Sequence, residues 1–402
     1  MTIYGRFGVR TRINAAGLLT RLGGSLMPAE VLEAMAEAAG SFVDMAELQA
    51  AASAVIVHHT GAGAGLVTAG AAAALTVGMA ACLTGLDAAR MDRLPETDDI
   101  PNEVLMCRTH RTGYDHALRA AGARIRDVGF NDRATGAGVR EVETWELEAA
   151  ITPRTAAIAY AAMPGSQPPL SEVVAAARRH SVPVLVDAAA QLPPATNLRR
   201  FIADGVDLVA YSGGKAIRGP QGTGILCGRQ DLIAAAALQQ FDMDVRPETW
   251  CPPENYLPRA ALRGIPHHGI GRGGKVSKEE IVGLLVALER FVALDHDAER
   301  ARQERLLSGI EERIADLPHF RSRLVSAAET GRDPLLELRV DEAALGLSAF
   351  GLSLTLQRGE PPVHLGERRA SEGILIINPV GLQEGDEAII VARIRAVCAV
   401  KG

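Results

Sequence analysis

The chain has 402 residues, of which 48% are hydrophobic, 22% charged and 4% aromatic, and its formal net charge is −6. This composition is typical of a soluble globular protein of two or three domains, and the dispersed basic residues argue against a nucleic-acid partner. The five cysteines are widely spaced and form no CxxC pair, which argues against a disulfide framework or a zinc site. We expect a cytoplasmic protein with a small-molecule partner, because the sequence contains neither a signal core nor an apolar run of membrane length.

The first 235 residues contain most of the predicted regular structure. The stretch up to about residue 24 is polar and Gly-rich and should be extended, whereas the apolar spacing from Pro28 to Gly40 predicts a helix. From about residue 50, apolar runs alternate with Ala-rich helical segments. The predicted strands are residues 103–107, 156–161, 182–187, 208–212 and 224–227, and the predicted helices are residues 68–83, 114–122 and 170–180. Strands that are apolar throughout indicate a mostly parallel sheet with helices on both faces, and therefore a large α/β domain.

The rest of the chain predicts long loops followed by a second domain. Residues 240–274 are rich in Pro, Gly and aromatic residues and should form long ordered loops. The apolar spacing from Lys278 to Leu307 predicts one long amphipathic helix that bridges two domains. A smaller α+β domain should follow, with strands at 335–340 and 374–377 and helices at 347–358 and 384–400. We therefore expect an N-terminal segment and helix at 1–45, a large α/β domain at 46–276, and a linking helix with the small domain at 277–402.

Asp187 and Lys215 follow two successive predicted strands. Asp187 ends the first strand, and Lys215 lies in a Ser-Gly-Gly-Lys turn after the second. Since the carboxyl ends of parallel strands meet at one crevice, the carboxylate and the amine should lie close together. Each residue alone would fit an ordinary turn or helix cap. Together they predict a pyridoxal 5'-phosphate (PLP) site, in which the lysine forms a Schiff base with the cofactor and the acid pairs with its pyridine nitrogen.

The cofactor's phosphate also needs a binding site, and the start of the Ala-rich helix offers one. The backbone amides of Gly70 and Ala71 would point at the phosphate from the helix N-terminus, and Ser212 would add a hydroxyl. A small-residue helix selected for tight packing is the alternative interpretation of this stretch. Gly61, Gly63 and Gly65, just upstream, do not have the spacing of a dinucleotide fingerprint, so a nicotinamide or flavin site is not expected.

Three histidines and an arginine add further candidates. His110 follows the strand at 103–107 and would lie over the same crevice, where an imidazole stacks on a cofactor ring or moves protons; a surface-loop histidine is the alternative. His267, His268 and Arg272 form a cationic group in a Gly-rich loop, suited to an anionic substrate. No further ligand at metal spacing follows the two adjacent histidines, so we expect no metal site.

Two residues of the N-terminal stretch are candidates for substrate binding. Thr20 and Arg21 would bind a carboxylate or phosphate of the substrate, together with Arg272. Exposed arginines are more often solvated or weakly paired, which is the alternative for both arginines.

Several segments resemble the selenocysteine synthase (SelA)-like group of fold-type-I PLP enzymes, particularly its D-glucosaminate-6-phosphate ammonia-lyase branch. The resembling segments are residues 12–28, 47–76, 182–194, 207–229 and 271–289. The most specific of them contains SGGKAIRGPQ, the turn that carries Lys215. Selenocysteine synthase itself has an N-terminal tRNA-binding domain, whereas this chain starts almost directly with the INAAG stretch, so action on tRNA is not expected.

The resemblance implies a fold, a cofactor site and an assembly. The fold would be like that of aspartate aminotransferase, with a mostly parallel, seven-stranded PLP-binding domain and a smaller α+β C-terminal domain. Lys215 would form the Schiff base, Asp187 would pair with the pyridine nitrogen, and His110 would stack on the ring. The phosphate would be contacted near Gly70, Ala71 and Ser212. A homodimer or higher oligomer with shared active sites is also implied.

The reaction expected from these residues is an α-proton abstraction followed by β-elimination. The substrate would be an amino acid or amino sugar acid, Lys215 would abstract the α-proton, and His110 or another acid would protonate a departing β-hydroxyl, so that a keto acid and ammonia are released. Two alternatives stay open. Reprotonation on the other face would give a racemase or epimerase, and a scaffold without catalysis would be a binding protein.

Overall fold

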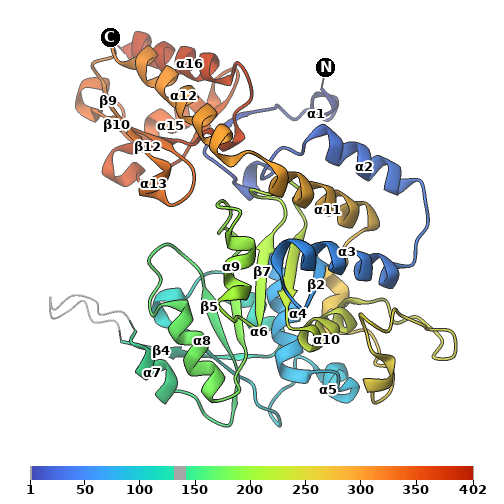
Figure 1. Cartoon of the computed structure of the whole chain (residues 1–402). Coiled ribbons are helices and arrows are strands. Elements are labelled where there is room, and N and C mark those ends of the chain that lie inside the picture. Colours follow the sequence, from blue (N-terminus) through green and yellow to red (C-terminus); the bar gives the residue numbers. More distant parts are fainter. Residues whose placement is uncertain (1, 131–141, 402) are drawn as a thin grey trace. The chain divides into compact units, whose positions relative to one another are not determined.

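The computed structural model describes residues 2–130 and 142–401 and divides the chain into two compact units (Figure 1). Unit 1 consists of Met1–Leu26 and Ala293–Gly402, and unit 2 is Met27–Val292. The expected division at residues 45 and 276 differs from this one, because the N-terminal strand pairs with a strand of the C-terminal part. No helix within the described ranges combines the length and apolarity needed to cross a bilayer.

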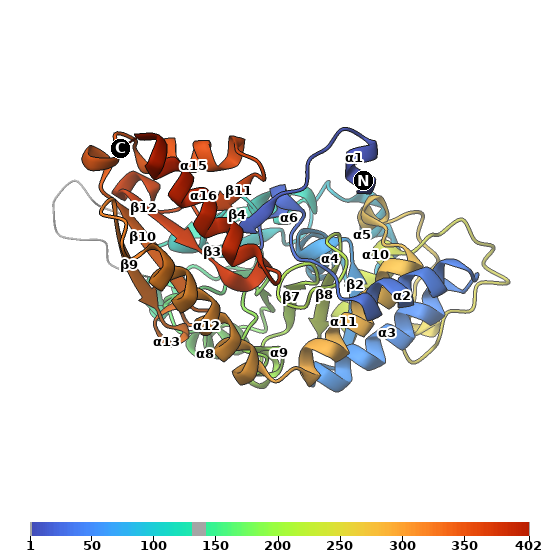
Figure 2. The ribbon, with the colours of Figure 1, turned by 90° about the horizontal axis from the view of Figure 1, so that it is seen from above.

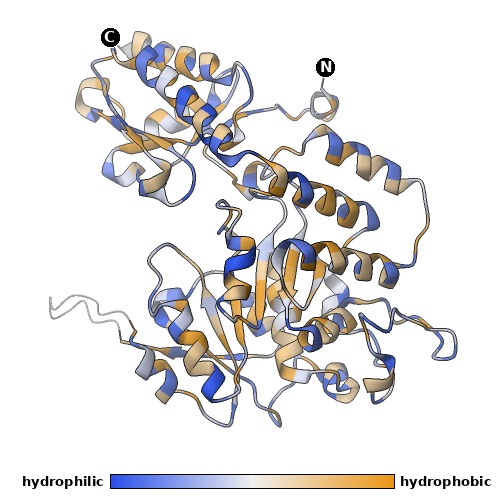
Figure 3. Cartoon of the chain, viewed as in Figure 1, coloured by the Kyte–Doolittle hydropathy of each residue, from blue (hydrophilic) through white to orange (hydrophobic). Residues whose placement is uncertain are grey.

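Unit 2 is built on a seven-stranded sheet of order β2-β8-β7-β6-β5-β3-β4. The strands are β2 (Ala64–Thr68), β3 (Glu103–Cys107), β4 (Arg124–Val128), β5 (Thr155–Ala161), β6 (Val184–Asp187), β7 (Leu208–Ser212) and β8 (Gly224–Gly228). Only β8 runs antiparallel to its two neighbours, so the predicted mostly parallel α/β sheet is confirmed. All residues of β2 and β8 are buried, and the hydrophobic colouring follows β7 and its neighbours in Figure 3.

Helices cover both faces of this sheet. They are α2 (Ala29–Ala39), α3 (Met45–Thr60), α4 (Gly70–Thr84), α5 (Ala88–Arg93), α6 (Asp115–Ala120), α7 (Thr144–Ala149), α8 (Leu170–Arg179), α9 (Asn197–Ala203), α10 (Gln230–Gln240) and α11 (Lys278–Ala293). One core cluster joins the sheet to α4, α6 and α10, and a second joins its other face to α3, α8, α9 and α11. The central helix α4 is Ala-rich and packs against β5 to β8, which small side chains make possible.

The helix predicted from Lys278 to Leu307 is wrong, because the chain forms two helices there. α11 ends at Ala293, and α12 (His296–Ile314) begins after Asp295, whose side chain accepts hydrogen bonds from the amides of Asp297 and Ala298. An aspartate in this position starts a new helix by satisfying amides that have no partner within the helix. α11 belongs to unit 2, where Ile281, Leu284 and Leu288 are fully buried in the core.

Unit 1 combines two small sheets with helices. β1 (Ile13–Ala15) pairs in parallel with β11 (Val363–Leu365), and a three-stranded antiparallel sheet has the order β12-β10-β9, which can be followed in Figure 2. The other elements of this unit are α1 (Ile3–Arg6), η1 (Thr20–Leu22), β9 (Phe320–Val325), α13 (Ala327–Thr330), β10 (Leu335–Val340), α14 (Glu342–Leu345), α15 (Ala349–Arg358), η5 (Ala370–Glu372), β12 (Ile374–Ile377), η6 (Pro379–Gly381) and α16 (Asp386–Lys401). The predicted α+β character of the C-terminal part is thus confirmed.

Candidate active site

The predicted cofactor residues lie at one edge of the seven-stranded sheet. Because β2, β3, β5, β6 and β7 run in the same direction, their carboxyl ends share that edge, and the antiparallel β8 begins there. His110 ends the 3-10 helix η2 (Arg108–His110) after β3, and Asp187 is the last residue of β6. Lys215 follows β7 by three residues, and Gly70 starts α4 two residues after β2. Such an edge is where open α/β sheets bind ligands.

Asp187 is a desolvated carboxylate with Lys215 nearby. Burial raises the pKa of Asp187, while the amide of Ala189, which donates a hydrogen bond to Oδ1 at 3.0 Å, and the charge of Lys215 act in the opposite direction. A carboxylate of this kind is stabilised by a cationic group that reaches it directly. The protonated nitrogen of a pyridine ring would be such a group, so the position fits the predicted role.

Two glycines allow close backbone packing around the predicted cofactor site. A Cβ atom on Gly224 would stand 2.6 Å from the backbone nitrogen of Ala71, and one on Gly214 would stand 2.5 Å from the Cα of Gln221. Real Cβ atoms do not come this close to backbone atoms, so neither position has room for a side chain. The start of β8 therefore packs directly against the first turn of α4, and the Lys215 turn folds back on residue 221.

The first turn of α4 has the features of an anion site. Gly70 has a φ of +84°, and the preceding Ala69 has no side chain that caps the helix. The amides of Gly70 and Ala71 therefore point out of the helix without an acceptor from a capping side chain, at the positive end of the helix dipole. Ser212 of β7 and Thr68 of β2 both pair with Gly224 of β8, from opposite sides of that strand. Ser212 therefore lies two strands away from the residue that precedes the first turn of α4. The arrangement fits the phosphate of PLP.

His110 is buried and held by Tyr160, which the sequence analysis missed. The two rings meet edge to face, with centroids 4.5 Å apart and an interplanar angle of 83°. The Tyr160 hydroxyl donates to the carbonyl oxygen of Pro168 at 3.1 Å, so its ring is fixed from the far end. Tyr160 precedes Ala161, the residue opposite Asp187 in the sheet. The sequence signal that could have identified Tyr160 is its position as a single aromatic residue near the end of an Ala-rich strand.

A small pocket of about 20 Å³ lies between the strand ends and the helices α4 and α6. Asp187 and Tyr160 line it together with Thr112 and Tyr114 from the segment after His110. The remaining lining residues are apolar: Leu75, Met106, Leu118, Ala159, Ala161 and Leu185. These apolar walls account for the desolvation of Asp187.

The predicted substrate residues are dispersed. Arg272 forms an ion pair with Asp242 at 2.5 Å, and His267 Nδ1 lies 2.8 Å from Asp92 Oδ2 in α5. α5 follows the C-terminus of α4, whereas Gly70 is at the N-terminus of that helix, so His267 is paired with a carboxylate from a segment beyond the other end of α4. Thr20 and Arg21 lie in η1 of unit 1.

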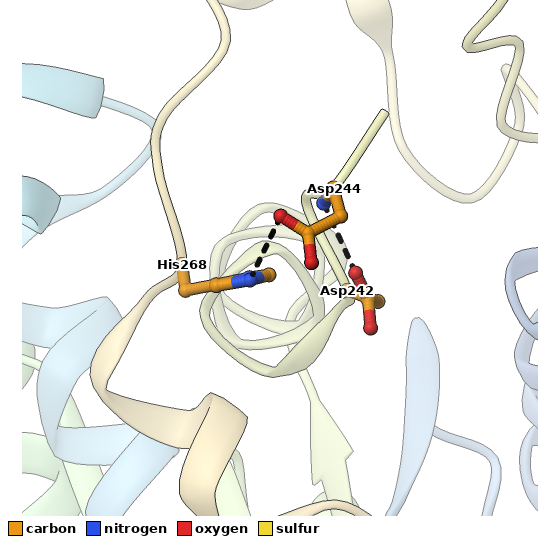
Figure 4. A group of neighbouring side chains, drawn as sticks. All are labelled: Asp242, Asp244 and His268. Carbon is orange, nitrogen blue, oxygen red and sulfur yellow. Dashed lines mark hydrogen bonds and ion pairs between the residues drawn. The ribbon is translucent and has the colours of Figure 1, made fainter. Parts of the chain in front are cut away.

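His268 takes part in a polar cluster instead of a substrate site. Asp242, Asp244 and His268 place their side chains together, with His268 Nε2 3.5 Å from Asp244 Oδ1 (Figure 4). The amide of Met243 donates to His268 Nδ1 at 3.1 Å, so the neutral ring carries its proton on Nε2 and directs it at Asp244. This pattern connects two loop segments, and it leaves no ring nitrogen with a lone pair for a cation.

The chain is similar to known proteins over nearly its whole length. The aminotransferase class-V family matches residues 114–334. The 5'-C-glycyluridine monooxygenase-decarboxylase of a Streptomyces species is 32% identical, covering 96% of this chain and 90% of that protein. The D-glucosaminate-6-phosphate ammonia lyase of Salmonella typhimurium is 31% identical, and the match covers 98% of this chain and 97% of that protein. An L-seryl-tRNA(Sec) selenium transferase of Geotalea uraniireducens is 26% identical, and the match covers 96% of this chain and 82% of that protein.

A solved structure of a D-glucosaminate-6-phosphate ammonia-lyase superposes on this chain with a TM-score of 0.82 and 29% identity, covering 100% of this chain and 99% of that one. The resemblance predicted from the sequence motifs is confirmed by this match and by the relatives above. The fold-type-I assignment and PLP as the cofactor are confirmed as well.

Replacing Gly224 by alanine should weaken PLP binding by about tenfold or more, because the added methyl would push the first turn of α4 away from β8 and misalign the amides of Gly70 and Ala71. The dissociation constant is measured by dialysis against PLP with absorbance detection. Gly273→Ala is the matched control, since a Cβ on Gly273 meets no atom within 4 Å. Equal PLP affinity in the two variants would contradict this view of the α4 turn.

Replacing Asp187 by asparagine should stabilise the cofactor-free protein while it weakens PLP binding, because the wild-type protein buries a charge there. A carboxyl group with a raised pKa in the folded state costs stability above that pKa, and the cost disappears as the pH falls through it. The advantage of the variant should therefore be larger at about pH 7 than at about pH 5. Thermal melting of both cofactor-free proteins measures it, and a variant that is less stable at both pH values argues against the idea.

Proposed function

Since the chain belongs to the aminotransferase class-V family of fold-type-I PLP enzymes, we propose that it is a PLP-dependent ammonia-lyase that acts on an amino sugar acid. The observation that carries this proposal is the match to D-glucosaminate-6-phosphate ammonia lyase over the full length of both chains, in sequence and in structure. The substrate of this chain would share the chemistry of such a compound: an amine beside a carboxylate, a hydroxyl on the next carbon, and an anionic group at the far end.

Different residues of unit 2 would bind different parts of the cofactor. Lys215 would hold it covalently through Nζ, Asp187 would keep its ring nitrogen protonated, and the amides of Gly70 and Ala71 with the Ser212 hydroxyl would hold the phosphate. PLP, when bound, supplies an electron sink for the charge that develops on the carbon beside the substrate amine. The apolar walls around Asp187 would exclude water from an ion pair between its carboxylate and the ring nitrogen, which would strengthen that pair.

Two side chains would move protons. Lys215 Nζ, once the substrate amine has taken its place, would remove the proton from the carbon that carries the amine. His110, fixed edge-on by Tyr160, would give a proton to the hydroxyl that leaves the next carbon as water. Addition of water to the resulting unsaturated amine then yields a keto acid and ammonia, so one water leaves and one is consumed. Thr20, Arg21, His267 and Arg272 stay predictions for substrate binding.

A second candidate reaction is decarboxylation of an amino acid with consumption of oxygen. It is favoured by one observation, the 32% identity over almost the whole chain to a monooxygenase-decarboxylase. The two candidates share the cofactor and the lysine, and they differ in what is released. Ammonia with a keto acid belongs to the first, and carbon dioxide with oxygen uptake belongs to the second.

Lys215→Ala should lose both the covalent cofactor and turnover. Purified wild-type protein should carry a violet absorption band that borohydride removes, leaving the cofactor's mass on the peptide that contains Lys215, and the variant should show neither. Amino sugar acids, with and without phosphate, are then incubated in deuterated water. Release of ammonia and a keto acid supports the lyase, whereas α-deuteration with inversion and no ammonia shows a racemase and excludes it.

We also propose that the chain is a homodimer, with an exposed apolar surface of unit 2 in the interface. Leu32, Phe42, Val43 and Met45 are all exposed around the connection from α2 to α3. Four large apolar side chains so close in sequence are unusual on a surface that stays in water.

Phe42→Asp should therefore lower the mass of the particle measured by light scattering from that of a dimer to that of a monomer. Leu354→Asp, on an exposed position of α15, should leave it unchanged. An unaltered dimer in the Phe42 variant would place the interface elsewhere.

A further inference from the structure

The N-terminal strand of unit 1 presents a polar face that none of the reactions above uses. β1 pairs with β11 in the register Ile13 to Val363, Asn14 to His364 and Ala15 to Leu365. The first and last of these pairs are buried in the hydrophobic core of the unit. Because side chains alternate along a strand, Arg12, Asn14 and His364 lie on the opposite face. Polar side chains thus gather on one side of these two strands.

His364 is buried on that face, and one of its ring nitrogens is a hydrogen-bond donor that lacks an acceptor among the described residues. Its side chain is only 4% exposed, and its Nε2 lies 3.2 Å from Arg12 Nη1. A guanidinium only donates, so Nε2 is the acceptor and the neutral ring carries its proton on Nδ1. Burial and the charges of Arg12 and Arg21 lower the pKa of His364, which agrees with a neutral ring. Within residues 2–130 and 142–401, Nδ1 has no hydrogen-bond partner.

A buried donor of this kind is unfavourable unless an acceptor reaches it. Most buried polar atoms in folded proteins have a partner, from the protein, from water or from a ligand. The neighbours of His364 indicate which acceptor fits. Arg12 and Arg21 both act electrostatically on the ring, so the partner of lowest energy is an oxygen that carries negative charge.

The carboxylate nearby is already committed. Glu367 Oε1 accepts hydrogen bonds from Ser353 and Gln357, each at 2.7 Å, and its Oε2 is 3.7 Å from Arg21. Glu367 therefore already has two hydrogen bonds and an ion pair with Arg21. Two residues before Arg12, in contrast, Arg10 has a carboxylate of its own, Glu360 at 3.1 Å. Near the neutral His364 ring, two guanidiniums, those of Arg12 and Arg21, are thus opposed by the carboxylate of Glu367.

We propose that Arg12, Arg21 and His364 form a binding site on unit 1 for a small anion, namely a phosphate or carboxylate group. The anion would accept the Nδ1 hydrogen of His364 and lie against the two guanidiniums, of which Arg21 is 3.7 Å from Glu367. The group comes either from the amine substrate or from a free anion in solution. The site is defined within unit 1 and its binding is measured without turnover, and only the assignment of the anion to the substrate rests on the proposed function.

The experiment titrates the PLP-loaded, full-length protein with inorganic phosphate, and separately with acetate, by calorimetry. Loading with PLP matters because it fills the anion site at α4. Arg12→Gln, Arg21→Gln and His364→Phe should each weaken phosphate binding by about tenfold or more, with the PLP absorption band unchanged. His364→Phe keeps the ring shape but removes both nitrogens. Arg10→Gln is the matched control and should bind as the wild type does.

The same samples distinguish the sources of the anion. If the substrate supplies it, phosphate inhibits competitively with the amine substrate, and Arg12→Gln raises KM while kcat is kept. If a free anion is bound, phosphate binds without competing. Both results support the site. Wild-type protein that binds neither phosphate nor acetate overturns it, as does an equal loss of affinity in Arg10→Gln. Should His364→Phe fail to fold, the exposed Arg12 variant still decides between these outcomes.

Discussion

The close approach of β8 to the first turn of α4 is the constraint on which the cofactor site depends. Gly224, the first residue of β8, leaves no room for a side chain against Gly70 and Ala71. β8 is also the only antiparallel strand of the sheet, so its start lies at the edge where its neighbours end. The turn with Lys215 leads from β7 into β8, and α4 follows β2 on the other side of β8. This contact therefore holds the lysine turn near the amides that we propose for the phosphate.

Burial at the same edge of the sheet determines the electrostatic environment of Asp187. Asp187 is surrounded by apolar side chains from three strands and two helices, so its charge is costly until a cation lies beside it. In the protein without cofactor, Lys215 reduces that cost only partly, since the pKa of Asp187 is still raised. A protonated ring nitrogen would bring a full charge to the carboxylate. If Asp187 pairs with the ring as proposed, relief of its unfavourable burial would contribute to the binding energy of the cofactor.

The sequence predicted the parts of the fold whose patterns are local. Strands such as β3 and β7, which are apolar throughout, were predicted with their observed bounds, and Lys215 and Asp187 follow from the strands that precede them. β4 was missed because it is an edge strand whose polar side chains, Arg124, Arg126 and Asp127, resemble a loop. Tyr160 and the break at Asp295 were missed for another reason. The edge-to-face contact with His110 is set by tertiary packing, and the break at Asp295 is a local capping signal; the apolar periodicity from which the elements were predicted reports neither.

The cationic residues considered as anion-binding candidates differ in whether they already have a carboxylate partner. His267 and Arg272 have carboxylate partners, Asp92 and Asp242, so a ligand anion would have to displace a partner that is already bound. Arg12 instead donates to a neutral imidazole, and an anion would add to that contact without displacing a carboxylate. The sequence analysis proposed His267 and Arg272 but not Arg12, because a sequence shows the cationic residues and not their partners. The pairing in the folded chain therefore moves the expectation of anion binding from the loop of Arg272 to the strand that follows Arg12.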